Sequence, residues 1–110
     1  MKALFEVFRG RIVAVLGMNL EGHIAGIRSN SEAMNSEKHV ISYEISDEYK
    51  YRITVTAKTI LENFSKVILI INSDEKCGVF DRIMNFETDV NEYPVLLLKN
   101  VENVNVYCFS

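Results

Sequence analysis

Two neighbouring runs, residues 39–45 and 49–57, show the clearest alternation of apolar and polar positions in the chain. Alternation of period two places one set of side chains on each face of a strand. A three-residue turn at residues 46–48 pairs apolar with apolar and acid with base, which predicts an antiparallel hairpin over residues 39–57. The predicted pairs are Ile45 with Tyr49, Tyr43 with Tyr51 and Glu44 with Lys50. The predicted buried face holds His39, Ile41, Tyr43, Ile45, Tyr49, Tyr51, Ile53 and Val55.

Several shorter apolar runs also predict strands. Residues 2–9 and 11–16 flank Gly10, which allows a tight turn or a bulge between them. Residues 23–28 predict a third short strand before a polar loop, in which residues 31–38 could form one helical turn. Towards the end of the chain, residues 95–99 and 101–109 predict two last strands after Pro94.

Helix signals are fewer. Thr59 and Glu62 have the spacing of a capping box, followed by apolar positions at helical spacing, which predicts a helix from Thr59 that ends near Lys66. The almost purely β-branched residues 67–71 then predict a buried central strand, although a helix continuing to Ile71 is an open alternative. Residues 76–84 fit a strand or a helix equally.

The chain as a whole is predicted to be one domain, residues 1–110. Its 110 residues are 48% hydrophobic, no segment is rich in Pro, Gly or Ser, and Val and Ile together outnumber Ala and Leu together. β-Branched side chains favour a pleated surface over a helix. The expected class is therefore α+β, with a predominantly antiparallel sheet, a sandwich or a half-barrel, and one or two short helices.

The charge pattern bears on compartment and partners. The formal net charge is −3, and the acids concentrate between residues 74 and 92. A negative field of this kind repels nucleic acid and attracts basic proteins. No signal peptide is predicted, and the longest apolar runs are far shorter than a membrane span, so we expect a cytoplasmic protein with Cys77 and Cys108 reduced.

No motif for catalysis, nucleotide binding or metal binding is found. Neither the pair His23 and His39 nor the pair Cys77 and Cys108 has the spacing of a zinc site. Oxygen-bearing residues at alternate positions in residues 85–91 lack the glycine and the terminal acid of a calcium loop. We therefore predict no catalytic residue, no cofactor and no metal.

The best candidate surface is the acidic stretch with aromatic residues within it. Aromatic and Arg side chains are enriched at the energetic centres of interfaces, and carboxylates steer cationic partners. The hypothesis is a non-enzymatic protein-binding module, a stoichiometric inhibitor or immunity protein that neutralises a basic toxin or nuclease. The alternatives are a small-ligand or enzymatic domain with a pocket between sheet and helix, and a structural homodimer. The predicted partner-binding residues are Asp81, Arg82, Phe86, Glu87, Asp89, Asn91, Glu92 and Tyr93.

Overall fold

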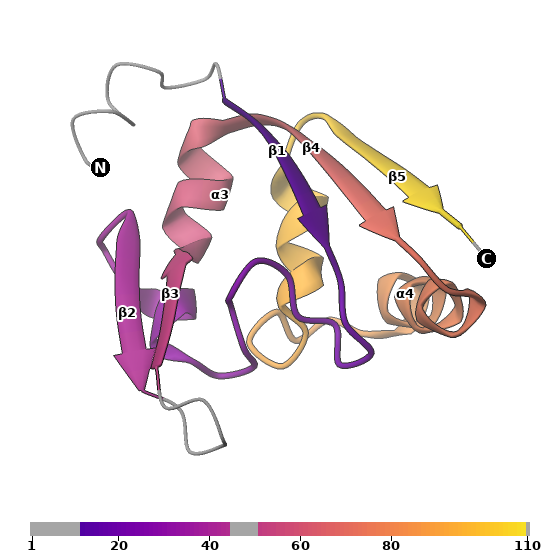
Figure 1. Cartoon of the computed structure of the whole chain (residues 1–110), viewed down its shortest axis with the longest axis horizontal. Helices are drawn as coiled ribbons and strands as arrows, with labels where there is room; N and C mark the ends of the chain where they lie inside the picture. Colours follow the sequence, from indigo (N-terminus) through magenta and orange to yellow (C-terminus); the bar gives the residue numbers. More distant parts are fainter. Residues whose placement is uncertain (1–11, 45–50, 110) are drawn as a thin grey trace.

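The computed structural model describes residues 12–44 and 51–109. These residues form a three-stranded sheet, a separate two-stranded sheet, three α-helices and a 3-10 helix (Figure 1). The elements in chain order are β1 (Ile12–Gly17), α2 (Glu32–Asn35), β2 (Val40–Glu44), β3 (Tyr51–Val55), α3 (Ala57–Asn63), β4 (Phe64–Ile71), α4 (Asp74–Phe86), η1 (Pro94–Asn100) and β5 (Val104–Cys108).

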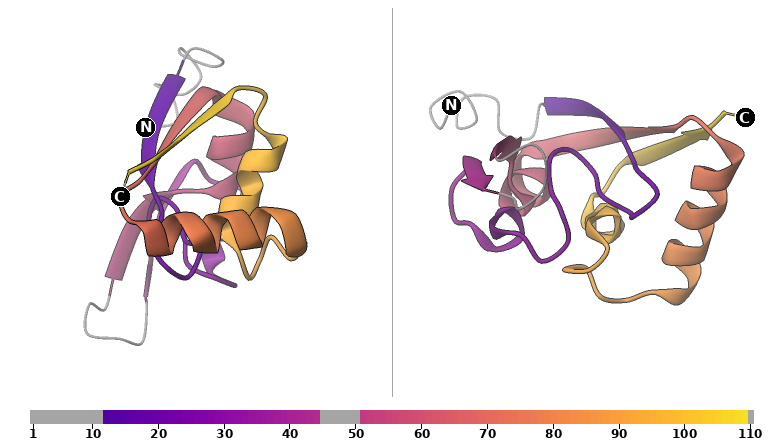
Figure 2. Two further views of the ribbon diagram at one scale, coloured as in Figure 1. Left: turned by 90° about the vertical axis from the view of Figure 1, so that its right-hand side faces the viewer. Right: turned by 60° about the horizontal axis from the view of Figure 1, so that its bottom comes forward.

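The three-stranded sheet has the order β1-β4-β5, and both pairs of strands are parallel. The inward-facing side chains of its central strand, Val67, Leu69 and Ile71, are fully buried. They pack against apolar side chains from α3, α4 and η1, including Ile60, Ile83 and the run 95–98. Both connections, β1 to β4 and β4 to β5, lie on this same side of the sheet (Figure 2). The core is therefore one layer of helices and loops under one face of a parallel sheet.

The predicted fold class is wrong. A predominantly antiparallel sheet was expected from short β-branched runs, but the larger sheet is parallel and the architecture is α/β. The central strand at 67–71 is confirmed within β4, and the run at 11–16 is confirmed as β1. What the periodicity did not reveal is that helical segments separate these strands, and parallel neighbours need such long crossovers. The predicted strand at 2–9 lies outside the described residues.

Two further predicted strands are not strands. Residues 95–99 lie in η1, where Pro94 occupies the first turn of the helix and four successive apolar side chains are buried. Residues 23–28 form a loop with two isolated bridges, in which Ala25 has a φ of 52°. A run of buried apolar residues is therefore compatible with a strand, a helix or a loop, and packing decides among them.

The helices differ from prediction mainly at their ends. α3 begins at Ala57 because the Thr56 side chain, not that of Thr59, caps it by accepting the Thr59 N–H. It ends at Asn63, slightly earlier than expected. The ambiguous segment 76–84 is helical within α4, which the Ser73 side chain caps through the Lys76 N–H. The predicted helical turn is confirmed as α2.

The hairpin is confirmed as β2 and β3, but its register differs by one residue. Tyr43 pairs with Arg52 and Glu44 pairs with Tyr51, whereas Tyr43 was expected opposite Tyr51. The shift reverses the faces of β3: Thr54 is buried, while Tyr51 and Ile53 are exposed. The predicted turn at 46–48 lies outside the described residues. Among the helices of the described segments, none is long and apolar enough to cross a membrane.

Candidate functional site

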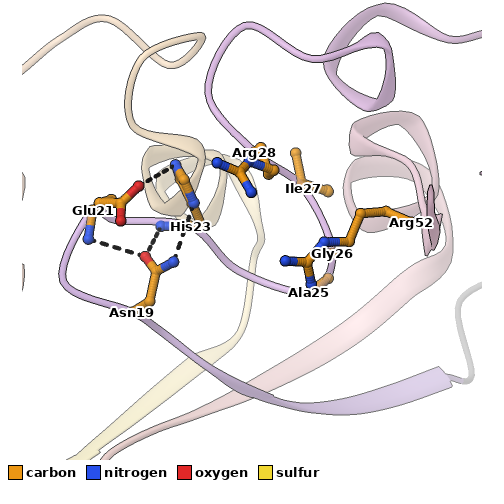
Figure 3. Close-up of a pocket in the computed structure, with 8 residues that line it drawn as sticks. All are labelled: Asn19, Glu21, His23, Ala25, Gly26, Ile27, Arg28 and Arg52. Carbon is orange, nitrogen blue, oxygen red and sulfur yellow. Dashed lines mark hydrogen bonds and ion pairs between the residues drawn. The ribbon is translucent and has the colours of Figure 1, made fainter. Parts of the chain in front are cut away.

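A pocket of about 260 Å³ lies beside the loop that follows β1 (Figure 3). Seven of its lining residues come from this loop and one, Arg52, comes from β3. This position matches a general rule of open α/β sheets, in which ligands bind beyond the carboxyl ends of the strands. The lining residues are Asn19, Glu21, His23, Ala25, Gly26, Ile27, Arg28 and Arg52.

Asn19 organises the first turn of this loop. Its Oδ1 accepts hydrogen bonds from the backbone N–H groups of Glu21, at 3.0 Å, and His23, at 2.9 Å. These two contacts fix the orientation of the amide, so its Nδ2 lies 3.1 Å from His23 Nδ1 and donates to it. Gly22, three residues after Asn19, has a φ of 79°, which disfavours other residues, and a Cβ there would lie 2.9 Å from Ile83 Cδ1, so that the Ile83 side chain would have to shift. The loop is thus held in a turn that presents the imidazole to the pocket.

The tautomer of His23 follows from these contacts. Since Nδ1 accepts a hydrogen bond from Asn19, the neutral ring carries its proton on Nε2 and donates to Ser29 Oγ at 2.9 Å. The Ser29 backbone N–H, 3.3 Å from Nε2, would require the opposite tautomer and is the weaker contact. The Ser29 hydroxyl in turn donates to the backbone carbonyl of Glu92.

Burial lowers the pKa of His23 below its ordinary value of 6.5, with smaller effects from neighbouring charges. Glu21, whose Oε2 lies 3.8 Å from Nε2, opposes the shift, while Arg28 and Arg52 reinforce it. The imidazole is consequently neutral near pH 7 and able to accept a proton.

The β2–β3 hairpin fixes the second half of the loop. The Tyr43 hydroxyl donates to the Gly26 carbonyl at 2.6 Å and accepts the Arg28 N–H at 3.2 Å. Thr54 Oγ1 accepts the Gly26 N–H at 3.0 Å. These polar contacts explain the observed register, because they require Tyr43 and Thr54 on the inner face of the hairpin.

The same register brings Arg52 to the pocket. Figure 3 shows its side chain extending past Gly26 towards Ala25, while the Arg28 side chain turns towards His23. Within the described part of the chain, Arg52 Nε is buried and has no hydrogen-bond partner. The pocket therefore combines a neutral imidazole with two guanidinium groups, an arrangement suited to an anionic ligand and a proton transfer.

None of the predicted partner-binding residues lines this pocket. Asp81, Arg82 and Phe86 lie in the second half of α4, Glu87 caps its carboxyl end, and the other four lie in the turn at 89–93. Asp89 accepts hydrogen bonds from backbone N–H groups of that turn. The backbone carbonyl of Asn91 accepts the Asn30 N–H at 2.7 Å, and that of Glu92 accepts from Ser29. This turn thus holds the loop that carries His23 in place through two backbone carbonyl groups.

The cysteines are both free. Burial raises the pKa of the Cys77 thiol to about 11, and a hydrogen bond with Cys108 adds to the shift. A thiol with such a pKa stays protonated at pH 7 and is a poor nucleophile. Among residues 12–44 and 51–109, no three His, Cys, Asp or Glu side chains gather closely enough to hold a metal ion.

The sequence analysis did not single out the residues of this loop that line the candidate site. His23 was tested only against the spacing of metal sites, and residues 23–28 were assigned to a strand. One feature of the sequence could have indicated this site. Polar residues follow directly after the apolar run of β1, in a segment that contains Gly22 and Gly26, as in a loop that binds a ligand. Arg52 was expected on the polar, outward face of the hairpin, and only the observed register brings it to the pocket.

The family model for glucosamine-6-phosphate isomerases and 6-phosphogluconolactonases matches residues 7–107. The chain belongs to this family. No protein with a curated function matches the chain.

Solved structures share the fold. A 6-phosphogluconolactonase from Shewanella baltica OS155 is 21% identical, covers 99% of this chain and has a TM-score of 0.76. One from Thermotoga maritima is 23% identical over 89% of this chain, with a TM-score of 0.73. A monomeric glucosamine-6-phosphate deaminase is 16% identical over 88% of this chain, with a TM-score of 0.70. The matched regions are 50%, 43% and 44% of those proteins, so this chain spans about half of their length or less.

Membership of this family corrects the functional hypothesis. The family and its structural neighbours are enzymes of sugar-phosphate metabolism, so a non-enzymatic inhibitor or immunity protein with a basic toxin or nuclease as partner was the wrong expectation. The alternative hypothesis of an enzymatic or small-ligand domain agrees better with these findings. Its pocket, however, lies between a loop and a hairpin and not between sheet and helix.

Proposed function

We propose that this chain carries a site for phosphorylated sugars, at which His23 acts as general base in a hydrolysis of the 6-phosphogluconolactonase type. One observation carries the proposal: a neutral imidazole shares a pocket with Arg52, whose buried Nε has no hydrogen-bond partner among residues 12–44 and 51–109. A buried unpaired donor costs free energy, and an anion bound beside it removes that cost.

In this proposal the two arginines bind the phosphate group of the substrate. Arg28 and Arg52 come from different elements, yet both line the pocket. A phosphate monoester carries close to two negative charges at neutral pH, and guanidinium groups bind its oxygens through paired hydrogen bonds. With the phosphate held there, the lactone ring of the same small sugar reaches towards the loop at residues 19–23.

His23 serves the proton transfer. The imidazole takes a proton from water at Nδ1 once substrate displaces the Asn19 amide, and the water oxygen forms a bond to the lactone carbonyl carbon. The ring C–O bond then breaks, and the proton returns from His23 to the departing ring oxygen, which leaves a hydroxyl and a carboxylic acid. The lowered pKa of His23 keeps the base neutral at physiological pH, as this sequence requires.

Binding of the phosphate is tested with 6-phosphogluconate, the product of the lactonase reaction, by isothermal titration calorimetry. Arg52→Gln is expected to weaken binding at least tenfold, because it removes the charge and the unpaired donor together. Lys58→Gln is the matched control, since Lys58 pairs with Glu37 outside the pocket and its loss leaves affinity unchanged. Equal affinity of Arg52→Gln and the unsubstituted chain would refute the phosphate site.

The catalytic role is tested by hydrolysis of the lactone above its spontaneous rate. His23→Gln keeps a polar planar side chain without a base, and we expect it to lower this rate about 100-fold or more while 6-phosphogluconate affinity changes little. A chain that binds the phosphosugar but adds nothing to the spontaneous rate would exclude hydrolysis by the chain on its own. A variant as fast as the unsubstituted chain would exclude His23 as the base.

A further inference from the structure

The two cysteines lie in contact with each other, although they are far apart in the sequence. Cys77 lies near the start of α4, and Cys108 is the last residue of β5. A hydrogen bond joins their thiol groups. Both views of Figure 2 show the end of β5 beside the first turn of α4. Since the 110 residues contain no other cysteine and both are free, the fold brings these two thiols together at one point.

The register of the sheet explains how Cys108 comes to face α4. Val67 and Ile71 of β4 are fully buried on the inner face of the sheet, which is the face that packs against α4. Their partners in β5 are Val104 and Cys108, respectively. Paired residues of neighbouring strands lie on the same face, and Val104 indeed packs against the core. The side chain of Cys108 is therefore on the inner face, towards α4.

One backbone carbonyl group brings the two cysteines together independently of the thiol contact. The Ile71 oxygen accepts the Phe109 N–H at 2.8 Å, which fixes the backbone directly after Cys108. The same oxygen lies 4.0 Å from Cys77 Sγ, whose thiol donates to it. The Cys77 sulfur and the backbone next to Cys108 therefore meet at a single atom of β4.

The two thiols differ in their access to solvent. The Cys77 side chain is partly buried and packs against the core, whereas Cys108 is exposed within the described part of the chain. Burial raises the pKa of Cys77 to about 11, and the contact with Cys108 adds to this shift. Since the thiolate is the reactive form, Cys77 is protected from an oxidant in solution, and Cys108 is the thiol that meets it.

We propose that Cys77 and Cys108 are a redox modification site, at which a small disulfide such as glutathione disulfide converts the two thiols into a reversible intramolecular disulfide. In the first step, the Cys108 thiolate attacks one sulfur of glutathione disulfide. A bond forms between Cys108 and this sulfur, and the sulfur–sulfur bond of glutathione disulfide breaks. The glutathione thiolate that leaves takes up the proton that Cys108 lost.

Cys77 completes the exchange. Once Cys108 carries glutathione, its thiol no longer contributes to the raised pKa of Cys77, so Cys77 loses its proton more readily. The Cys77 thiolate then attacks the Cys108 sulfur, and the second glutathione leaves and takes up that proton. The two protein thiols are thus oxidised by two electrons, and one glutathione disulfide is reduced to two molecules of glutathione.

The disulfide would tie β5 to the start of α4. It closes a loop of about 30 residues in the unfolded chain, which lowers the conformational entropy of that state and so favours the folded one. Neither cysteine lines the pocket beside His23, and no sugar phosphate takes part in the exchange. The proposal is therefore independent of the proposed function, and each can fail without the other.

The order of the two steps is tested by mass spectrometry of the chain incubated with glutathione disulfide. The unsubstituted chain is expected to remain a single chain and to lose two hydrogen atoms, and dithiothreitol should restore them. Cys77→Ser should stop with one glutathione bound to Cys108. Cys108→Ser should react at least about tenfold more slowly than the unsubstituted chain, because Cys77 is protected. If Cys108→Ser took up glutathione as fast as Cys77→Ser does, the assigned order would be wrong.

A matched control moves the exposed thiol to the other face of the same strand. Tyr107 precedes Cys108 in β5 and is 47% exposed, but its side chain lies on the outer face, away from α4. Tyr107→Cys combined with Cys108→Ser should therefore bind glutathione and form no disulfide with Cys77. If this variant formed the intramolecular disulfide as fast as the unsubstituted chain, the contact at Cys108 would not direct the reaction.

Urea denaturation gives the second measurement. Oxidation should lower the equilibrium constant of unfolding of the unsubstituted chain at least about tenfold, and circular dichroism checks that each variant is folded. Cys77→Ser treated in the same way should show no such gain. A disulfide between two chains, glutathione on both cysteines of one chain, or an intramolecular disulfide without this gain would overturn the proposal. Each of these results would mean that the folded chain does not hold the two thiols in position to bond.

Discussion

The three-stranded sheet and the two-stranded hairpin achieve burial in different ways. In the sheet, the inward positions of β4 are Val67, Leu69 and Ile71, and apolar packing alone holds them. In the hairpin, the inward positions include Tyr43 and Thr54, whose hydroxyls bond to the backbone of the loop after β1. Apolar positions follow a period that is visible in the sequence, whereas polar inward positions depend on the partner they meet.

This difference separates scaffold from site. The sheet provides a rigid layer, and β1 delivers the loop with His23 to its carboxyl end. The hairpin is not part of that sheet, yet it fixes the loop through Tyr43 and Thr54 and contributes Arg52 to the pocket. Substitutions in the sheet should therefore act on global stability, and substitutions in the hairpin on the loop.

The largest effect is expected at the sheet. Leu69→Ala leaves a cavity in the fully buried inner face and should lower the free energy of unfolding by about 2–5 kcal/mol, measured by urea denaturation. The control is Ile70→Ala on the outer face of the same strand, where 40% exposure should reduce the loss to less than half. Equal losses at the two positions would contradict the assignment of inner and outer faces.

A smaller effect is expected where the hairpin meets the loop. Tyr43→Phe keeps the ring and removes both hydroxyl contacts to the loop, so it should lower the free energy of unfolding by about 1–3 kcal/mol. Amide hydrogen exchange at Arg28 should accelerate, which reports on the loop directly. Tyr51→Phe is the control, since Tyr51 is 68% exposed and its substitution should change neither quantity. If the rate of amide exchange at Arg28 were unchanged in Tyr43→Phe, the hairpin would not hold the loop in place.

The smallest effect is the pH dependence contributed by His23. Its pKa in the folded chain is lower than the ordinary value of 6.5, so the unfolded chain binds this proton more readily. The free energy of unfolding therefore falls as the pH drops through about 6.5 towards the lower pKa of the folded state. Thermal unfolding between about pH 7.5 and pH 5 should show a steeper loss for the unsubstituted chain than for His23→Gln. Parallel curves would show that burial does not disfavour the charged imidazole.

The outcome for the hairpin shows why part of the site could not be predicted. Apolar alternation placed Tyr51 and Ile53 inside, and cross-strand pairs with the correct chemistry supported that register. The structure places Arg52 and Thr54 inside, one residue away, because Thr54 accepts the Gly26 N–H and Tyr43 bridges Gly26 and Arg28. Those partners lie between 15 and 28 residues away in the chain and come into contact only when the loop folds back on the hairpin.

The acidic stretch between residues 74 and 92 is a second region whose role could not be predicted from its side chains. Its charges suggested a binding surface, but the observed contacts of Asn91 and Glu92 with the His23 loop use backbone carbonyls, which any residue offers. Asp89 bonds to the turn that it belongs to. Side-chain chemistry therefore gave no indication that this turn supports the pocket.

The sequence by itself determined those helices and strands whose formation depends on a few neighbouring residues. The β-branched run of β4, the strand at β1, the existence of the hairpin and the helical turn at α2 all follow from periodicity and propensity over a few residues. Only the tertiary structure decided the parallel order of the strands, the register of the hairpin and the meeting of His23 with Arg52. All three features depend on crossovers and on hydrogen bonds between segments that are distant in the chain. Such contacts stabilise the fold only once those segments are packed together.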